Sequence, residues 1–191
     1  MSLSRRQLRK SAEALAKDGL GRQQIFSALR MQVGEKDDEK LARIVRYVPS
    51  LAARRRYKMP HAVLLVLLWL TVVGKSLYGI NVAMDSGWSR WYAALTLPAI
   101  TVILSVAVAM YRTRAYHTIA FLSVIGLFRY FTHVDMDHFD PWDSVDLIVA
   151  AAVIGLSWYL FMKMASNYEV IKTADGGTAI LFPSDPETGT T

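Results

Sequence analysis

The chain has 191 residues, of which 53% are hydrophobic, and a formal net charge of +6 at pH 7. This hydrophobic share is high for a soluble domain of that size, so the excess is expected to lie in lipid. The absence of cysteine excludes disulfides, iron–sulfur clusters, thiolate zinc sites and cysteine nucleophiles.

The range 1–58 is the basic part of the chain, with 15 of the 22 Lys and Arg and 6 of the 16 Asp and Glu. Apolar spacing predicts a helix over about residues 4–17, then a break at residues 18–21. A second helix contains Ile25 and Leu29 and ends at Gly34, and a third starts near residues 37–38. Three helices this short bury little surface, so we expect the module to lie against the membrane, against the transmembrane bundle or against a partner.

A basic run closes this part of the chain and consists of Arg54, Arg55, Arg56 and Lys58. Cations next to a membrane span hold its end on the cytoplasmic side. They also attract anionic lipid headgroups, with about 1 kcal/mol per cation near the surface. We therefore predict a topology anchor that contacts anionic lipid.

Four apolar stretches follow, at about residues 60–80, 91–111, 115–131 and 146–164. A spanning helix needs roughly 20 residues and at least about 17. We therefore expect four transmembrane helices, the second and third of which are antiparallel neighbours because only residues 112–114 connect them. On the fourth, Ala151 and Gly155 lie one turn apart, which suits close contact with another helix but also fits chance in an Ala-rich segment.

The charges flanking these stretches predict the orientation. Cations precede the first stretch, fill the turn at residues 112–114 and end the fourth at Lys163, whereas acids occupy the other two connections. Because Lys and Arg in short loops stay in the cytoplasm, both termini are expected there, in an inner or plasma membrane.

After the fourth stretch, residues 168–173 and 178–182 are two β-prone runs around a short Asp-Gly-Gly segment. This pattern predicts a β-hairpin. An isolated hairpin is hardly stable in water, so it needs a surface to lie on. The apolar side chains expected to dock it onto a partner are Ile171, Ile180, Leu181 and Phe182.

The predicted fold is an all-α integral membrane protein in which a four-helix transmembrane bundle carries a small N-terminal three-helix module and a short C-terminal hairpin. The expected domains are the cytoplasmic module at residues 1–58, the transmembrane domain at 59–165, the hairpin at 166–183 and a disordered tail at 184–191.

The connection before the fourth stretch is the densest polar cluster of the sequence. Four carboxylates occupy positions 1, 3, 9 and 12 of a twelve-residue window, as in a calcium loop, namely Asp135, Asp137, Asp143 and Asp146. His133 and His138 would assist a transition metal. Position 5 is Phe139 and position 6 is Asp140 where the loop calls for Gly, so the fit to a calcium site is imperfect.

Helix capping explains most of the same acids. Asp140 before Pro141 fits an N-cap with proline at the first helical position, and Asp143 fits an acidic first turn. Capping and topology are therefore the favoured interpretation, and a docking surface for a basic partner on the outer side is a further alternative. No cofactor is predicted apart from the alternative of a divalent cation.

Charged residues inside the stretches are Lys75, Arg129 and Asp146, all toward the outer side. They are close enough in depth to form an intramembrane polar cluster, and snorkelling of the two cations is the equal alternative. Because no Asp, Glu or His falls at mid-membrane depth, the residues of a usual transporter site are missing.

The chain carries no phosphate loop, hydrolase or zinc-protease motif, so we do not expect an enzyme. A helix-turn-helix rhythm over residues 15–29 is followed by acids that repel phosphate, so no nucleic-acid partner is expected. The sequence predicts an accessory, scaffold or assembly subunit that docks onto other membrane proteins, or onto itself, through the helical module and hairpin. The alternatives are a sensor or regulator with a cation-responsive acidic loop and a small channel or transporter.

Overall fold

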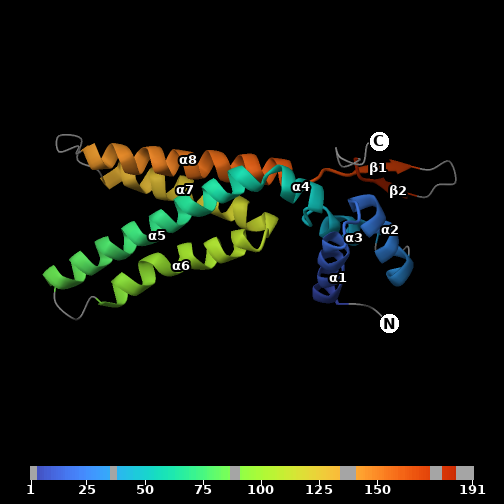
Figure 1. Ribbon diagram of the computed structural model, residues 1–191, viewed down its shortest axis with the longest axis horizontal. Helices are drawn as coiled ribbons and strands as arrows, with labels where there is room; N and C mark the ends of the chain where they lie inside the picture. The colour runs from blue at the N-terminus through green and yellow to red at the C-terminus, as the bar shows by residue number, and fades with distance from the viewer. Residues whose placement is uncertain (1–3, 35–37, 87–90, 134–140, 173–177, 184–191) are drawn as a thin grey trace. The chain divides into compact units, whose positions relative to one another are not determined.

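The computed structural model describes residues 4–34, 38–86, 91–133, 141–172 and 178–183. The chain divides into two compact units (Figure 1). We call Met1–Lys58 together with Phe161–Thr191 the mixed unit, and Met59–Leu160 the helical unit. The described residues are mostly helical and add one two-stranded antiparallel sheet.

Local signals set the ends of the first three helices, α1 (Arg5–Lys17), α2 (Arg22–Val33) and α3 (Asp38–Val45). Ser4 and Gln7 form a capping box at the start of α1, where each side chain accepts the other's backbone N–H. Gly34 follows α2 with a φ of +84°, a backbone conformation that residues with a Cβ atom rarely adopt. These boundaries agree with the helices predicted from the sequence.

A fourth short helix, α4 (Leu51–Arg56), occupies the basic run and was not predicted. Its N-cap is Ser50, whose hydroxyl accepts the N–H of Ala53 at 3.3 Å. Pro49 just before this cap ends the preceding segment, so the sequence did contain the signal for a new helix start.

The predicted hairpin is confirmed as two antiparallel strands, β1 (Glu169–Lys172) and β2 (Thr178–Leu181). Their register pairs Val170 with Ile180 and Ile171 with Ala179. Because side chains alternate along a strand, Val170 and Ile180 share one face of the sheet, and Ile171 and Leu181 share the other.

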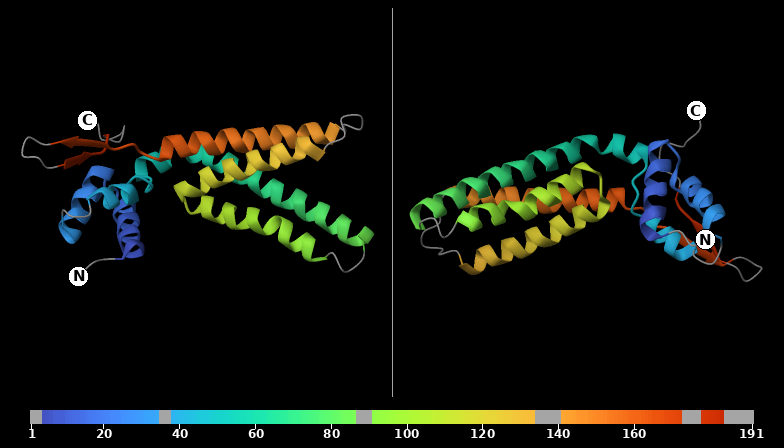
Figure 2. Two further views of the ribbon diagram at one scale, coloured as in Figure 1. Left: turned by 180° about the vertical axis from the view of Figure 1, so that it is seen from behind. Right: turned by 90° about the horizontal axis from the view of Figure 1, so that it is seen from below.

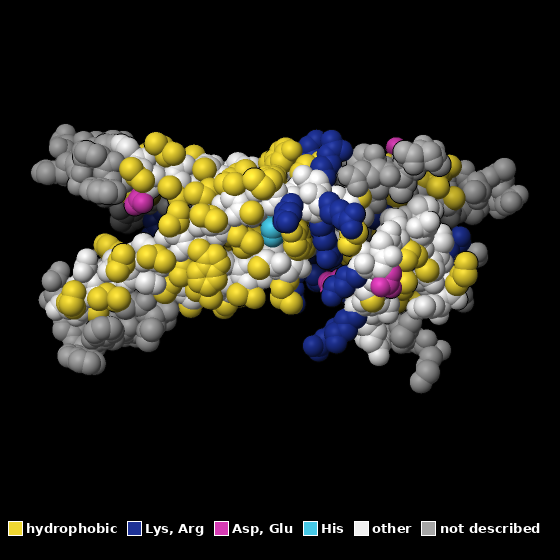
Figure 3. Space-filling model, viewed as in Figure 1, with side chains coloured by type: hydrophobic (Ala, Val, Ile, Leu, Met, Phe, Trp, Pro, Cys, Tyr) yellow, Lys and Arg dark blue, Asp and Glu magenta, His cyan; other side chains and the backbone are white. Residues whose placement is uncertain are grey.

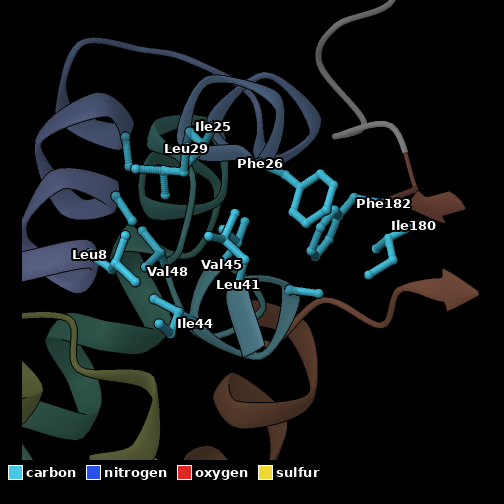
Figure 4. Packing of buried hydrophobic residues seen from close by; sticks show 13 residues of the cluster. Leu8, Ile25, Phe26, Leu29, Leu41, Ile44, Val45, Val48, Ile180 and Phe182 are labelled. Carbon is cyan, nitrogen blue, oxygen red and sulfur yellow. The ribbon is translucent and has the colours of Figure 1, made fainter. Parts of the chain in front are cut away.

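One hydrophobic core joins the three N-terminal helices to the end of the chain (Figure 4). Its buried members are Leu8, Ala12, Ala16, Ile25, Phe26, Leu29, Leu41, Ala42, Ile44, Val45, Val48, Ile180 and Phe182. The Phe182 ring lies against Phe26 and against Tyr168, with centroids 5.8 Å and 5.7 Å apart. The hairpin thus supplies the apolar wall that three short helices lack.

The helical unit is built from α5 (Lys58–Ser86), α6 (Trp91–Ala109), α7 (Thr113–His133) and α8 (Pro141–Met164), which also reach into the mixed unit at Lys58 and beyond Leu160. A tight turn joins α6 to α7, where Tyr111 has a φ of +54° and the N–H of Arg112 donates to the carbonyl of Ala107. We call the end of the unit that holds this turn the proximal end, and the other the distal end.

Two helical segments within the described residues are long and apolar enough to cross a membrane, Lys58–Asn81 and Ser144–Met164. They coincide with the first and fourth predicted stretches. Within the part of α6 whose side chains the structure describes, Pro98–Ala109 is a further apolar helical segment. Hydrophobic side chains cover much of the visible face of these helices (Figure 3), as membrane association requires.

Candidate interaction surfaces

The two faces of the hairpin have different environments. Ile180 and Phe182 are 5% and 6% exposed and belong to the core of the mixed unit. Ile171 and Leu181, on the opposite face, are 43% and 46% exposed. Two of the four side chains predicted to dock a partner are therefore buried against the chain's own helices, and the other two remain accessible.

The side-chain amide of Gln23 on α2 forms hydrogen bonds with the backbone at the end of β2. Its side-chain oxygen accepts the N–H of Phe182 at 2.9 Å, and its amide nitrogen donates to the carbonyl of Ile180 at 3.5 Å. One amide group thus pairs with the edge of β2, as a neighbouring strand would. The sequence could not reveal this contact, because Gln23 and Ile180 lie 157 positions apart.

Arg22, the neighbour of Gln23, is a buried cation that caps the C-terminal end of α8. Its guanidinium donates to the carbonyl of Met164 at 2.9 Å and to that of Val48 at 3.3 Å. Met164 is the last residue of α8, so the cation meets the negative end of the helix dipole and a carbonyl without a partner inside the helix. Arg46 makes a second contact with the residues that follow α8. Its guanidinium donates a hydrogen bond to the side-chain amide oxygen of Asn167 at 3.1 Å.

The predicted lipid anchor lies on α4 and at the start of α5. Arg55, Arg56 and Lys58 are exposed, whereas Arg54 is half-buried. Basic side chains gather around this segment (Figure 3). The accessible cations can therefore reach anionic groups, which is the chemistry that headgroup contact needs.

At the proximal end of the helical unit, a histidine missed by the sequence analysis joins α5 to α7. The Nδ1 atom of His61 lies 2.8 Å from the hydroxyl of Tyr116, and both side chains are buried. The ring of Tyr111 stacks on His61 with centroids 4.1 Å apart. Only the position of His61 near the start of an apolar stretch could have drawn attention to it, because its partners come from another helix.

The three charged residues predicted to cluster are all exposed in the structure. Lys75 donates to the hydroxyl of Thr101 on α6 at 3.3 Å. Among the described residues, no ion pair joins Lys75 or Arg129 to Asp146. The polar cluster is thus not formed in this structure.

The small residues of α8 make no close helix contact here. Ala151 and Gly155 are both exposed, and a Cβ built on Gly155 would meet no atom within 4 Å. Close packing of another helix against Ala151 and Gly155 stays a prediction, and that helix would come from another protein chain.

The candidate metal loop falls largely outside the described residues. Asp135, Asp137 and His138 lie in the range that the structure leaves out, and the side chains of His133 and Asp143 are likewise not described. Asp146 is exposed on α8. Within the part of the chain that is described, no group of three His, Asp or Glu side chains could hold a metal ion.

Comparison of this chain with family models, with curated proteins and with solved structures finds no match.

Proposed function

We propose that this chain is a non-enzymatic membrane protein that binds other membrane proteins as an accessory or assembly subunit. The observation that carries the proposal is the two-sided hairpin. Its inner face completes the core of the mixed unit, while its outer face presents Ile171 and Leu181 to the surroundings. Val170 is also accessible, but it lies on the same face of the sheet as Ile180 and is not part of this outer face.

The outer face suits a partner because it combines apolar side chains with a rigid support. The core beneath it and the amide of Gln23 fix β2, so little side-chain and backbone freedom would be lost on binding. Ile171 and Leu181 lie on one face of the same small sheet, so a single partner surface could contact both. A partner that covers this face would remove them from water.

The proposed membrane arrangement has four spans with both termini in the cytoplasm of an inner or plasma membrane. The two apolar segments Lys58–Asn81 and Ser144–Met164 support the first and the fourth. If the cations of α4 and Lys163 both lie on the cytoplasmic side, the number of crossings between these two spans is even, so α6 and α7 either both cross or both stay out of the membrane. We propose that both cross. The docking face and the anionic-lipid contacts of α4 would then share the cytoplasmic side.

Site-specific photocrosslinking in native membranes tests the docking face. A photoreactive residue at position 171 or 181 is expected to give a crosslinked band whose partner is the same for both positions. The same label at Met31, which is exposed on α2 of the same unit, is the matched control and should not give that band.

A second measurement separates binding from misfolding. The double change Ile171→Ser and Leu181→Ser should abolish the crosslinked complex and leave the proteolysis pattern of the mixed unit unchanged, because neither side chain belongs to the core. The proposal is wrong if the double variant keeps its partner, or if the purified chain is a monomer that is active by itself in liposomes.

A further inference from the structure

Away from the proximal end, the described inner faces of α5 and α8 each contain one charged residue. On α5, a row of residues spaced three or four apart lies on one side of the helix and is buried apart from Lys75, namely Leu64, Leu68, Val72, Lys75, Gly79 and Ala83. On α8, the corresponding row runs through Asp146, Ala150, Val153, Ser157, Leu160 and Met164, and its buried part begins at Val153. Residues at these spacings share a helix face, so Lys75 and Asp146 belong to inward faces although both are exposed.

The contact of Lys75 supports this placement. Its ammonium reaches Thr101, which precedes the buried Ser105 and Val108 on the inward face of α6. The charge therefore points toward a neighbouring helix. By contrast, Leu77 lies on the opposite side of α5, among exposed apolar side chains.

The two charges also lie at matching depth. The proximal end of α5 is its first residue, Lys58, and the proximal end of α8 is its last residue, Met164. With a helical rise of about 1.5 Å per residue, Lys75 lies about 26 Å from Lys58, and Asp146 lies about 27 Å from Met164.

The pair α5 and α6 meets the pair α7 and α8 at the proximal end and parts from it toward the distal end. At the proximal end, His61 and Tyr116 join α5 to α7, and Leu64, Val108 and Leu160 are buried. Toward the distal end, α5 and α6 diverge from α7 and α8 (Figures 1 and 2). Inward-facing charges are thus exposed where the helix pairs part.

We propose that Lys75 and Asp146 form an ion pair that closes the distal half of the helical unit, with the contact between His61 and Tyr116 as the pivot. An ionisable group inside a membrane span is costly unless it finds a partner of opposite charge or water. Asp146 has no ion pair among the described residues, and Lys75 has a single hydroxyl contact. Approach of α8 toward α5 brings the two charges together.

Disulfide trapping tests this closure directly, because the chain contains no cysteine of its own. The variant Lys75→Cys with Asp146→Cys is oxidised in native membranes, and its intramolecular disulfide is detected as a thiol pair protected from maleimide until reduction. Bridging requires Cβ atoms about 4 Å apart, so only a closed form reacts. The matched control, Leu77→Cys with Asp146→Cys, differs only in the side of α5 and should react several-fold more slowly.

Charge reversal gives an independent measurement. Lys75→Glu and Asp146→Lys are each expected to lower the melting temperature of the purified protein by several degrees, and the two together to recover most of this loss. The closure is overturned if the two cysteine pairs react at equal rates, if the disulfide joins two separate chains, or if the double reversal is as unstable as the two single changes combined.

Discussion

Replacement of Arg22 by Met is the sharpest test of how the mixed unit is held together. Met preserves most of the apolar stem of the side chain, so the change removes the guanidinium and little packing volume. The carbonyls of Val48 and Met164 then lose their donor, and the end of α8 loses its cation.

The magnitude follows from the two contacts. A hydrogen bond from a charged donor contributes about 1.5 to 3 kcal/mol, and a cation at a partly buried helix C-terminus contributes up to about 2 kcal/mol. These terms share one group and do not add in full, and removal of the guanidinium also relieves its desolvation. We expect Arg22→Met to lower the free energy of opening of the mixed unit by about 2 to 4 kcal/mol.

Native-state hydrogen exchange on the full-length protein in detergent measures this change, because it reports local opening without requiring two-state unfolding of the whole chain. Amides of α2 and α3 should exchange faster in Arg22→Met. The control is Arg43→Met, which removes an exposed cation 3.9 Å from Glu39 and should change the free energy by less than about 1 kcal/mol. Equal exchange rates in the two variants would refute the role assigned to Arg22.

Phe182→Ala should destabilise the mixed unit by about 3 to 5 kcal/mol, whereas Val170→Ala at an exposed position of the same sheet should change little; similar effects of both on proteolysis would contradict the core described above. A reporter fused after Thr191 and one inserted near Gly87 should lie on opposite sides of the membrane, and a shared compartment would remove one of the four proposed spans. If the acidic loop binds a divalent cation, Asp137→Asn should weaken the binding measured by calorimetry and leave the fold intact. Absence of any heat with Ca²⁺, Mn²⁺ or Zn²⁺ at millimolar concentration would end the metal hypothesis.

Features with local causes were predictable from the sequence. The first helix near residues 4–17, the glycine that ends α2 and the two strands of the hairpin depend on residues within a few positions of one another. Hydrophobic length alone identified the segments that form the apolar helices α5 and α8.

Features that depend on distant partners were not predictable. The sequence indicated that the helical module and the hairpin each needed a surface, but not that each supplies the surface for the other. Arg22 looked like one of many cations, because its buried position follows from the approach of α8. In the same way, the pairing of His61 with Tyr116 depends on how two helices pack.

The joint core of the mixed unit also constrains the order of events during synthesis. Its helices α1 to α3 are made first, yet Ile180 and Phe182 emerge only after α5 to α8 have been made. At the usual rate of synthesis of about 5 to 20 residues per second, the apolar side chains of the hairpin follow the early helices after a delay on the order of 10 s. During that interval Phe26 and its neighbours lack the packing contacts of Ile180 and Phe182, so the complete core can form only after the chain has been synthesised past α8.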